Sequence, residues 1–358
     1  MQKDAKAFLF DLLRTPSPTG NEIEGQRKWA TYVRQYSDSV ESDAYGNAWA
    51  MLAGSDPNAP RVMIEAHADE IGFMVKHITK HGFIYLDRVG GSDAAVGRAR
   101  KLTILGDKGP VLGVVGNTAI HIRDSDGERA PKVHQLFVDI GRDSAEDVAK
   151  AGIRVGHFAV YPDEPAELGK HLLTGRALDN RIGGFIIAQV MQKLHKRKER
   201  HTATVFAVNA VQEEIGGYGA MMVTHRLSPA VALCLDVTHA TDTPGISETK
   251  HGEVELGGGP TITHGSAVHP LVAKRLLEVA EKAKIDIQHE ASSRYTGTDT
   301  DSIYCIKEGV PSGLISLPLR YMHSVVETVD YRDVEATVDL ITAFVESIQA
   351  GDTFRWEL

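Results

Sequence analysis

The hydrophobic pattern of the first 70 residues is that of an α/β domain. Residues 4–13 and 21–36 carry apolar side chains at helical spacing, and the prolines of TPSPTGNE between them end the first helix. The apolar runs NAWAML and RVMIEAHAD come next and have the composition of strands. This order predicts two helices followed by two strands.

A different pattern occupies residues 72–165. Short alternating segments such as GFIYLDRV, KLTILG and QLFVDIG are separated by turns that contain Gly and Asp. Alternation with a period of two residues is typical of strands that bury one face. We therefore predict a small β-rich module here.

Helix and strand signals alternate again after this module. Helix-like DNRIGGFIIAQVMQKLHKR precedes strand-like ATVFAVNAV, and helical patterns recur at 270–284 and 332–348. Such alternation is typical of an α/β sheet with helices on both faces. Because the N-terminal segment carries similar elements, we predict one α/β domain made of residues 1–71 and 166–358, interrupted by the β-rich module.

Length and composition narrow the class of protein. The chain has 358 residues, of which 42% are hydrophobic, enough for a sizeable core. Its formal net charge of −9 and the lack of an arginine-rich stripe argue against nucleic acid as a partner. The first 20 residues contain no basic stretch leading into an apolar core, and no later apolar run is long enough to span a bilayer. We expect a cytoplasmic protein with no membrane partner.

Histidine and carboxylate side chains stand where the predicted strands end. His67 and Asp69 lie two residues apart at the end of a strand, so both side chains face one side and Asp69 can accept a ring N–H from His67. Asp236 ends the apolar run ALCLD, and His323 ends SGLISLPLRYMH. For each of these residues a structural role or a simple exit to solvent is the alternative to a functional one.

Two further segments carry acidic residues near glycines. Asp179 begins a predicted helix in GRALDNRIGG, where an N-cap is the alternative interpretation. The segment NAVQEEIGGYG places Glu213 and Glu214 side by side after a buried strand. Adjacent glutamates that leave a strand diverge, so one can bind an ion while the other stays free.

Together these residues predict a metal centre. In open α/β sheets the carboxyl ends of the strands form the ligand crevice, so the scattered side chains can converge there. Two histidines and several carboxylates without cysteine suit Zn²⁺, Co²⁺ or Mn²⁺. Two such ions would offset the repulsion among the carboxylates and activate a water against a carbonyl, and a further unbound carboxylate would serve as the general base.

The same motifs resemble those of a known family. HADEIGFMV, ALDNRIGG, VQEEIGG, LDVTHATDTPG and YMHSVVETVD occur in the order found in the dinuclear aminopeptidases of peptidase family M42, which includes the TET and glutamyl aminopeptidases. The resemblance covers nearly the whole chain. It implies a three-layer sheet of the phosphorylase/hydrolase-like, zinc-peptidase type with an inserted PDZ-like dimerisation domain. It also implies a homo-oligomer in which dimers assemble to a tetrahedral dodecamer.

A ligand set follows from the resemblance. Asp179 would bridge two divalent metal ions per subunit, Zn or Co with Mn as a further candidate. His67 and Asp236 would complete one site, while Glu214 and His323 would complete the other.

The resemblance also implies an activity, the removal of N-terminal residues from short peptides. Glu213 would be the general base, and Asp69 would orient His67. Asp299, in the motif GTD, is a candidate for substrate contact, with a helix cap as the alternative. A related carboxypeptidase or N-deacylase, and a non-catalytic peptide-binding assembly stabilised by metals, are the competing functions. The preferred N-terminal residue is left open, as is the question of whether the loop 116–133 reaches a neighbouring active site.

Overall fold

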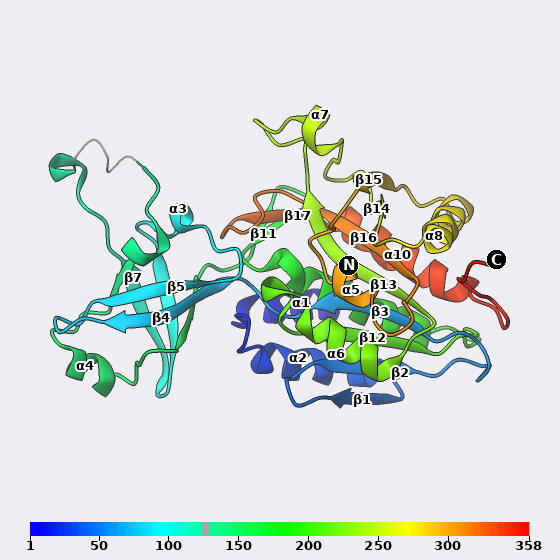
Figure 1. The fold of residues 1–358 in the computed structure, drawn as a ribbon, viewed down its shortest axis with the longest axis horizontal. Coiled ribbons are helices and arrows are strands. Elements are labelled where there is room, and N and C mark those ends of the chain that lie inside the picture. Colours follow the sequence, from blue (N-terminus) through cyan, green and yellow to red (C-terminus); the bar gives the residue numbers. More distant parts are fainter. Residues whose placement is uncertain (124–128, 358) are drawn as a thin grey trace.

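Eight strands form the central sheet of the larger part of the molecule (Figure 1). The structure is a computed structural model that describes residues 1–123 and 129–357. The strands at the middle of the sheet run parallel, and antiparallel pairs lie toward both edges. Their order is β1 (Ser39–Ser42), β2 (Ala48–Leu52), β12 (Val205–Ala210), β3 (Val62–His67), β13 (Val231–His239), β16 (Ser312–Leu319), β14 (Thr261–Gly265) and β15 (Gln288–Ser292).

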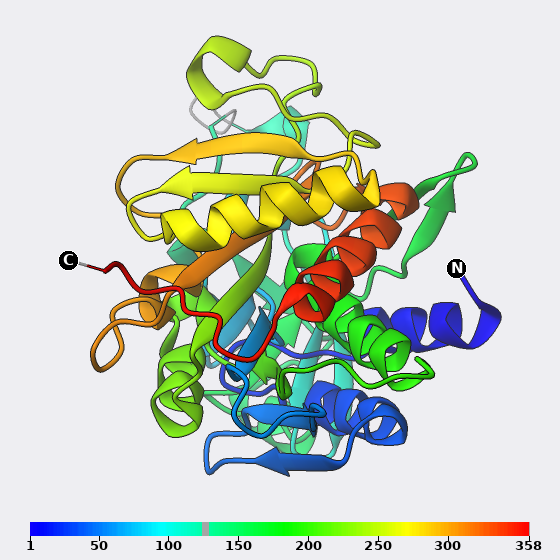
Figure 2. The ribbon, with the colours of Figure 1, turned by 90° about the vertical axis from the view of Figure 1, so that its right-hand side faces the viewer.

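Helices pack on both faces of this sheet. Neighbouring residues of β3 point to opposite faces, so Ile64 packs in the core on one side and Met63 in the core on the other. Figure 2 shows α8, α10 and α5 side by side over the first face. That face is covered by α1 (Lys3–Arg14), α2 (Ile23–Val33), α5 (Leu178–His195), α8 (Pro270–Ala283) and α10 (Tyr331–Ser347), and the other by α6 (Tyr218–Leu227) and α9 (Thr300–Ile303).

The predicted α/β fold is therefore confirmed. Long helices form where apolar residues recur at helical spacing, and α8 and α10 each bury one such stripe. Within the described residues, no helix combines the length and the apolar composition that crossing a bilayer requires.

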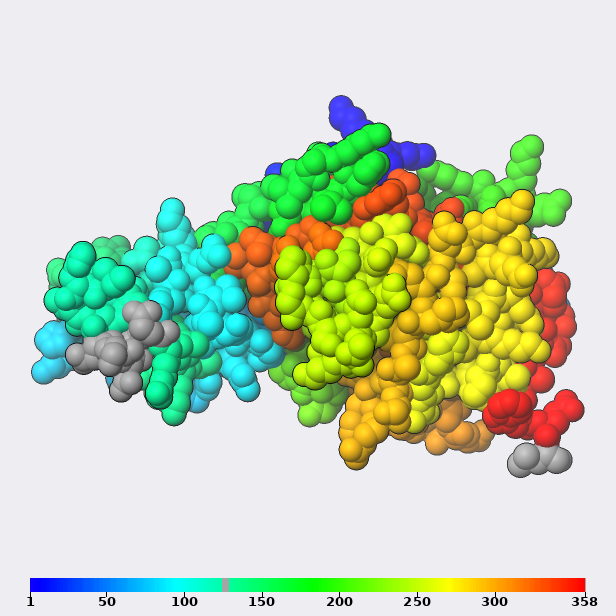
Figure 3. Space-filling model, turned by 90° about the horizontal axis from the view of Figure 1, so that it is seen from above, coloured from blue at the N-terminus to red at the C-terminus, as the bar shows by residue number. Residues whose placement is uncertain are grey.

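The inserted segment is β-rich, as predicted, and has its own apolar core. It forms a lobe beside the larger part of the molecule (Figure 3). Its strands close into a six-stranded barrel, and this finding does not by itself establish the predicted PDZ-like fold. In the loop 116–133, residues 124–128 lie outside the described part of the chain. Around the barrel the strands are β4 (Gly72–Ile78), β5 (Ile84–Val89), β8 (Phe137–Asp139), β7 (Gly109–Val115), β6 (Lys101–Gly106) and β9 (Phe158–Val160), with α3 (Ala94–Gly97) and α4 (Ala145–Lys150) beside them.

The remaining elements are short. A three-stranded antiparallel sheet contains β10 (Ala166–Leu168), β11 (Leu172–Gly175) and β17 (Glu327–Asp330), and α7 (Glu248–His251) lies in a long loop. Single 3₁₀ turns span Arg34–Tyr36, Ile120–Ile122, Val133–Gln135 and Glu213–Ile215. The last of these turns carries the glutamate pair into the site.

Candidate active site

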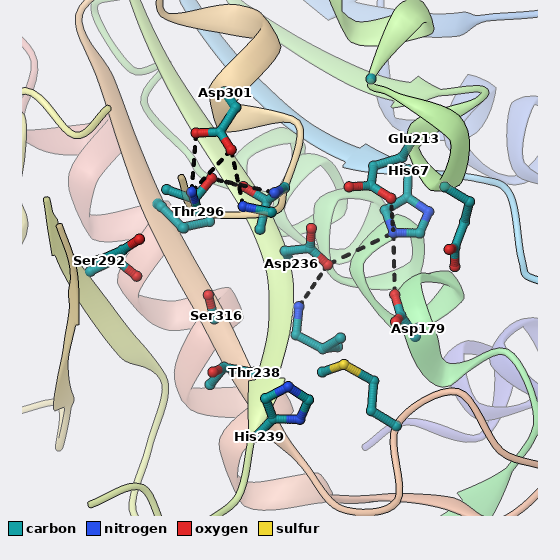
Figure 4. A pocket seen from close by; sticks show the side chains of 18 of the residues that line it. His67, Asp179, Glu213, Asp236, Thr238, His239, Ser292, Thr296, Asp301 and Ser316 are labelled. Carbon is teal, nitrogen blue, oxygen red and sulfur yellow. Dashed lines mark hydrogen bonds and ion pairs between the residues drawn. The ribbon is translucent and has the colours of Figure 1, made fainter. Parts of the chain in front are cut away.

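A cavity of about 670 Å³ opens beside the carboxyl ends of the parallel strands (Figure 4). Its volume is in the range of small-ligand pockets. The cavity wall brings together six of the residues predicted from the sequence, which are His67, Asp179, Glu213, Glu214, Asp236 and His323.

Strand register explains how His67 and Asp236 meet. β13 pairs with β3 in parallel, and the last pair joins Cys234 to Glu65. Two residues further along each strand, His67 and Asp236 are level, and their Nε2 and Oδ1 atoms lie 3.7 Å apart. The sequence predicted that Asp236 ends its strand. In the structure it does not, because β13 continues beyond the end of β3 and pairs there with β16.

Asp179 lies between the two histidines. Its Oδ1 is 3.2 Å from His67 Nε2, and its Oδ2 is 3.4 Å from His323 Nε2. The capping bond at this end of α5 is made by the neighbouring Asn180, whose Oδ1 accepts the backbone N–H of Gly183 at 3.0 Å, and not by Asp179. Asp179 has non-helical backbone angles, and its carboxylate faces the cavity instead of capping the helix.

The candidate ligands fall into two groups that share one residue. His67, Asp179 and Asp236 form the first, and Asp179, Glu214 and His323 form the second, with the ligand atoms of each group within 4.8 Å of one another. Tetrahedral bonds of 2.0–2.1 Å separate ligand atoms by roughly 3.3 Å, close to the contacts that Asp179 makes with both histidines. The donor set is nitrogen and oxygen, so the residues fit the predicted ions.

Glu213 belongs to neither group. Its Oε2 lies 3.8 Å from His67 Nε2, next to the first group, and its side chain is 14% exposed. Glu214 instead contacts the second group, with Oε2 3.8 Å from His323 Nε2. The two adjacent glutamates diverge, as the sequence suggested.

Asp69 contacts the site differently from the prediction. His67 Nδ1 donates to the backbone carbonyl of Asp69 at 3.1 Å, and the carboxylate Oδ1 is 3.5 Å away. The carboxylate instead accepts the backbone N–H groups of Glu213 at 3.1 Å and Glu214 at 3.2 Å, and the hydroxyl of Thr19 at 2.8 Å. Asp69 thus fixes the turn that carries the glutamate pair, because its buried oxygens need donors and that turn supplies two.

Asp299 does not line the cavity. It is 1% exposed, makes no cap bond to α9, and lies beside the carboxyl group of Glu65. Burial raises the pKa of Asp299 well above its usual range and that of Glu65 to about 7. The structure therefore places Asp299 behind the wall, where a proton shared with Glu65 would satisfy both groups.

Protons balance the charge of the site when it holds no metal ion. Burial raises the pKa of Glu213 to about 9, and it raises the pKa of Glu214 well above the usual range. The hydrogen bond with Asp179 raises the pKa of His323 to about 9. Although burial lowers it, the pKa of His67 is raised well above its usual value by Glu213 and the neighbouring aspartates. The arrangement attracts positive charge, which divalent cations supply in place of protons.

Two features of the site were not predicted. Glu327, in the motif YMHSVVETVD, is 1% exposed and accepts the backbone N–H groups of Asp179 at 3.1 Å and His323 at 2.9 Å. Gly91, from the loop after β5, lies so close to His323 that a Cβ there would be 2.4 Å from Nδ1. Glu327 could have been noticed as an acidic residue four positions after His323, whereas nothing in the sequence signals the contact with Gly91.

Two glycines near the site are required for different physical reasons. Gly217 has a φ of +70°, and a Cβ there would be 2.1 Å from Ser302 Oγ, so the turn after the glutamates excludes other residues. A Cβ on Gly183 would lie 2.9 Å from that of Ala66, so this glycine lets α5 approach β3 closely.

Comparison with known proteins gives a consistent result. A profile of the M42 glutamyl aminopeptidase family matches residues 46–340. The chain is 33% identical over 350 residues to a lysyl aminopeptidase of Pyrococcus furiosus, covering 96% of this chain and 98% of that protein. These matches confirm the resemblance inferred from the motifs.

Solved structures agree with the sequence matches. An aminopeptidase from the archaeon Desulfurococcus kamchatkensis has a TM-score of 0.89 at 34% identity, covering 96% of this chain and 94% of that one. The TET1 peptidase of Pyrococcus horikoshii, described as able to assemble into a tetrahedron or a large octahedral shell, has a TM-score of 0.84 at 25% identity, covering 96% and 99%. The chain therefore belongs to the M42 glutamyl aminopeptidase family.

Proposed function

We propose that the protein is an aminopeptidase that uses two divalent metal ions to remove N-terminal residues from short peptides. The observation that carries this proposal is the pair of ligand groups sharing Asp179, with Glu213 beside them and in neither. Membership of the M42 family supports the same activity.

Each ion would have its own ligands. One would be held by His67 and Asp236 and the other by Glu214 and His323, with Asp179 between them. Zn²⁺ or Co²⁺, with Mn²⁺ as a further candidate, would polarise the scissile carbonyl and lower the pKa of water when bound.

The remaining residues handle protons and geometry. Glu213 would accept the proton of the attacking water and return it to the leaving amine. Asp69 holds the backbone of Glu213 in place, and Glu327 holds the backbone of Asp179 and His323. These bonds restrict the reacting groups to one geometry, which is the main requirement for a positioned general base.

The lining of the cavity disfavours the competing functions. A carboxypeptidase needs a cation for the substrate carboxylate, and no lysine or arginine lines the described cavity. Purely structural metal sites are closed by protein ligands, whereas both ligand groups here face an open cavity. An N-deacylase differs from an aminopeptidase in accepting blocked amines, so substrates can separate those two.

We further propose that the protein is a homo-oligomer and that the inserted module, residues 72–165, forms part of the subunit interface. The TET1 structure supports assembly for a relative. The inserted module also exposes large apolar side chains, at Leu112 and Val114 on β7 and at Ile120 and Ile122 in the following loop, which a partner subunit would cover.

Hydrolysis of an aminoacyl-p-nitroanilide panel tests the activity. The protein is first stripped with a chelator and then reloaded with Zn²⁺ or Co²⁺. Free aminoacyl substrates should be cleaved only after reloading, and their N-acetylated counterparts should be inert. Cleavage of acetylated substrates with no cleavage of free ones would identify an N-deacylase instead.

A further inference from the structure

Besides Glu213, two carboxylates in the cavity lie outside both ligand groups. They are Glu290 on β15 and Asp301 on α9, and both line the cavity. No lysine or arginine in the described cavity wall balances them. The part of the cavity away from the metal ligands is therefore acidic.

The carboxylate of Asp301 already has a structural role. It accepts backbone N–H groups from Thr296 at 3.0 and 3.1 Å and from Gly297 at 3.0 Å. These bonds fix the loop before α9, as the contacts around Asp301 in Figure 4 show. Asp301 thus contributes negative charge, but its oxygens are engaged by the backbone.

Glu290 is held only by hydroxyl groups. It accepts from Thr238 at 2.6 Å and Thr263 at 3.1 Å, with Thr261 at 3.4 Å. Among the described residues it has no ion-pair partner. The threonines satisfy the carboxylate oxygens and fix them in one orientation, and the negative charge can still bind a cation.

Glu290 lies at a defined position relative to the metal ligands. Thr238, its nearest partner, is on the same face of β13 as Asp236, two residues further along the strand. Two residues of strand span roughly 7 Å. A side chain that starts at the metal centre and ends in a cation must cover this distance, which suits the flexible four-carbon stem of lysine.

We propose that Glu290 is the specificity residue of the site and selects substrates whose N-terminal residue has a basic side chain, lysine first. The inference rests on the proposed aminopeptidase function, because it assigns Glu290 to the side chain of the residue that is removed. The ammonium group would bind Glu290, and the hydroxyls of Ser292 and Ser316 line the same cavity (Figure 4). Acidic N-terminal residues would be repelled.

Lysyl and norleucyl p-nitroanilides give the sharpest test, since the two side chains have similar length and differ in charge. The wild-type kcat/KM should be highest for lysyl, lower for norleucyl and lowest for glutamyl substrate. Glu290→Gln keeps the shape of the side chain, and it should lower the lysyl-to-norleucyl ratio by roughly 10- to 100-fold, the range for losing a charged hydrogen bond. Glu281→Gln, an exposed carboxylate on α8, is the matched control and should leave the ratio as in wild type.

Ligand-observed NMR gives a readout that does not depend on turnover. Saturation transfer to L-lysine should exceed that to L-norleucine in metal-free wild type, and the difference should disappear in Glu290→Gln. Equal loss of activity on both substrates in this variant would show that Glu290 only ties strands together, and would overturn the inference.

The two proposals fail in different ways. Hydrolysis of norleucyl or leucyl substrates without a lysyl preference would overturn the role of Glu290 and leave the aminopeptidase function intact. Absence of hydrolysis of every free aminoacyl substrate by the metal-loaded protein would overturn the proposed function. In that case selective NMR binding of lysine that depends on Glu290 would still support the cation pocket.

Discussion

Two walls of the cavity differ in the groups that surround their carboxylates. The metal wall, formed by His67, Asp179, Glu214, Asp236 and His323, packs charged groups so closely that the ligand atoms of each group lie within 4.8 Å of one another. The hydroxyl wall, formed by Glu290 with Thr238 and Thr263 and supported from behind by Thr261, surrounds one carboxylate with neutral donors.

The two arrangements suit cations that remain bound for different lengths of time. Crowded carboxylates are stable only when cations or protons remain between them, so the metal wall suits ions that are bound throughout the reaction. A single carboxylate fixed by hydroxyls is satisfied without a cation and can still bind one, so the hydroxyl wall suits a substrate that arrives and leaves. Changes in the metal wall should therefore have larger effects than changes in the hydroxyl wall.

The largest effect is expected at the general base beside the metal wall. Glu213→Gln should lower kcat by roughly 10²–10⁴-fold, the usual contribution of such a base. Elemental analysis should still find two metal ions per subunit, because Glu213 belongs to neither ligand group. Loss of an ion in this variant would mean that the roles of Glu213 and Glu214 are reversed.

The metal-free protein should lose stability as pH rises from 5 to 9. The pKa of Glu213 is raised from 4.5 to about 9 in the folded state, so the folded protein binds more protons than the unfolded chain between these values. Each such group lowers the free energy of unfolding as pH rises from its unfolded to its folded pKa. His323, with its pKa raised to about 9, acts in the same direction.

Thermal melts across this pH range, with a chelator and with Zn²⁺, measure the effect. Because metal binding displaces protons, the rise in melting temperature caused by Zn²⁺ should grow with pH. A melting temperature of the chelated protein that increases from pH 5 to pH 9 would contradict the description of the metal wall.

The smallest effect is expected from a single hydroxyl of the other wall. Thr238→Val keeps the branched shape and removes the donor at 2.6 Å from Glu290. The lysyl-to-norleucyl ratio of kcat/KM should fall by roughly fivefold, equivalent to about 1 kcal/mol for one hydrogen bond. Thr342→Val, which removes a buried hydroxyl of α10 bonded to a helix carbonyl, is the control and should not change the ratio.

Much of the metal wall could be predicted because several of its members lie at or just after strand ends, although His323, expected to end a strand, follows the end of β16 by four residues. His67 ends β3, and the glutamate pair follows β12, so strand boundaries alone bring them to one edge of the sheet. Asp236 was expected at a strand end and instead lies within β13, because register with β3 and β16 sets its level. The contacts of Asp69 also differ from the prediction, because they depend on which backbone N–H groups the turn at Glu213 presents.

The sequence by itself determined the α/β pattern, the inserted β-rich module and the chemical type of the metal ligands, because periodicity and residue chemistry are local properties. Only the tertiary structure determined that the strands of the insertion close into a barrel and that Asp299 is buried behind the lining of the cavity. It also decided that Glu290 meets Thr238, two residues that are 52 positions apart. That contact depends on the order and register of four strands, which no short segment of the chain specifies.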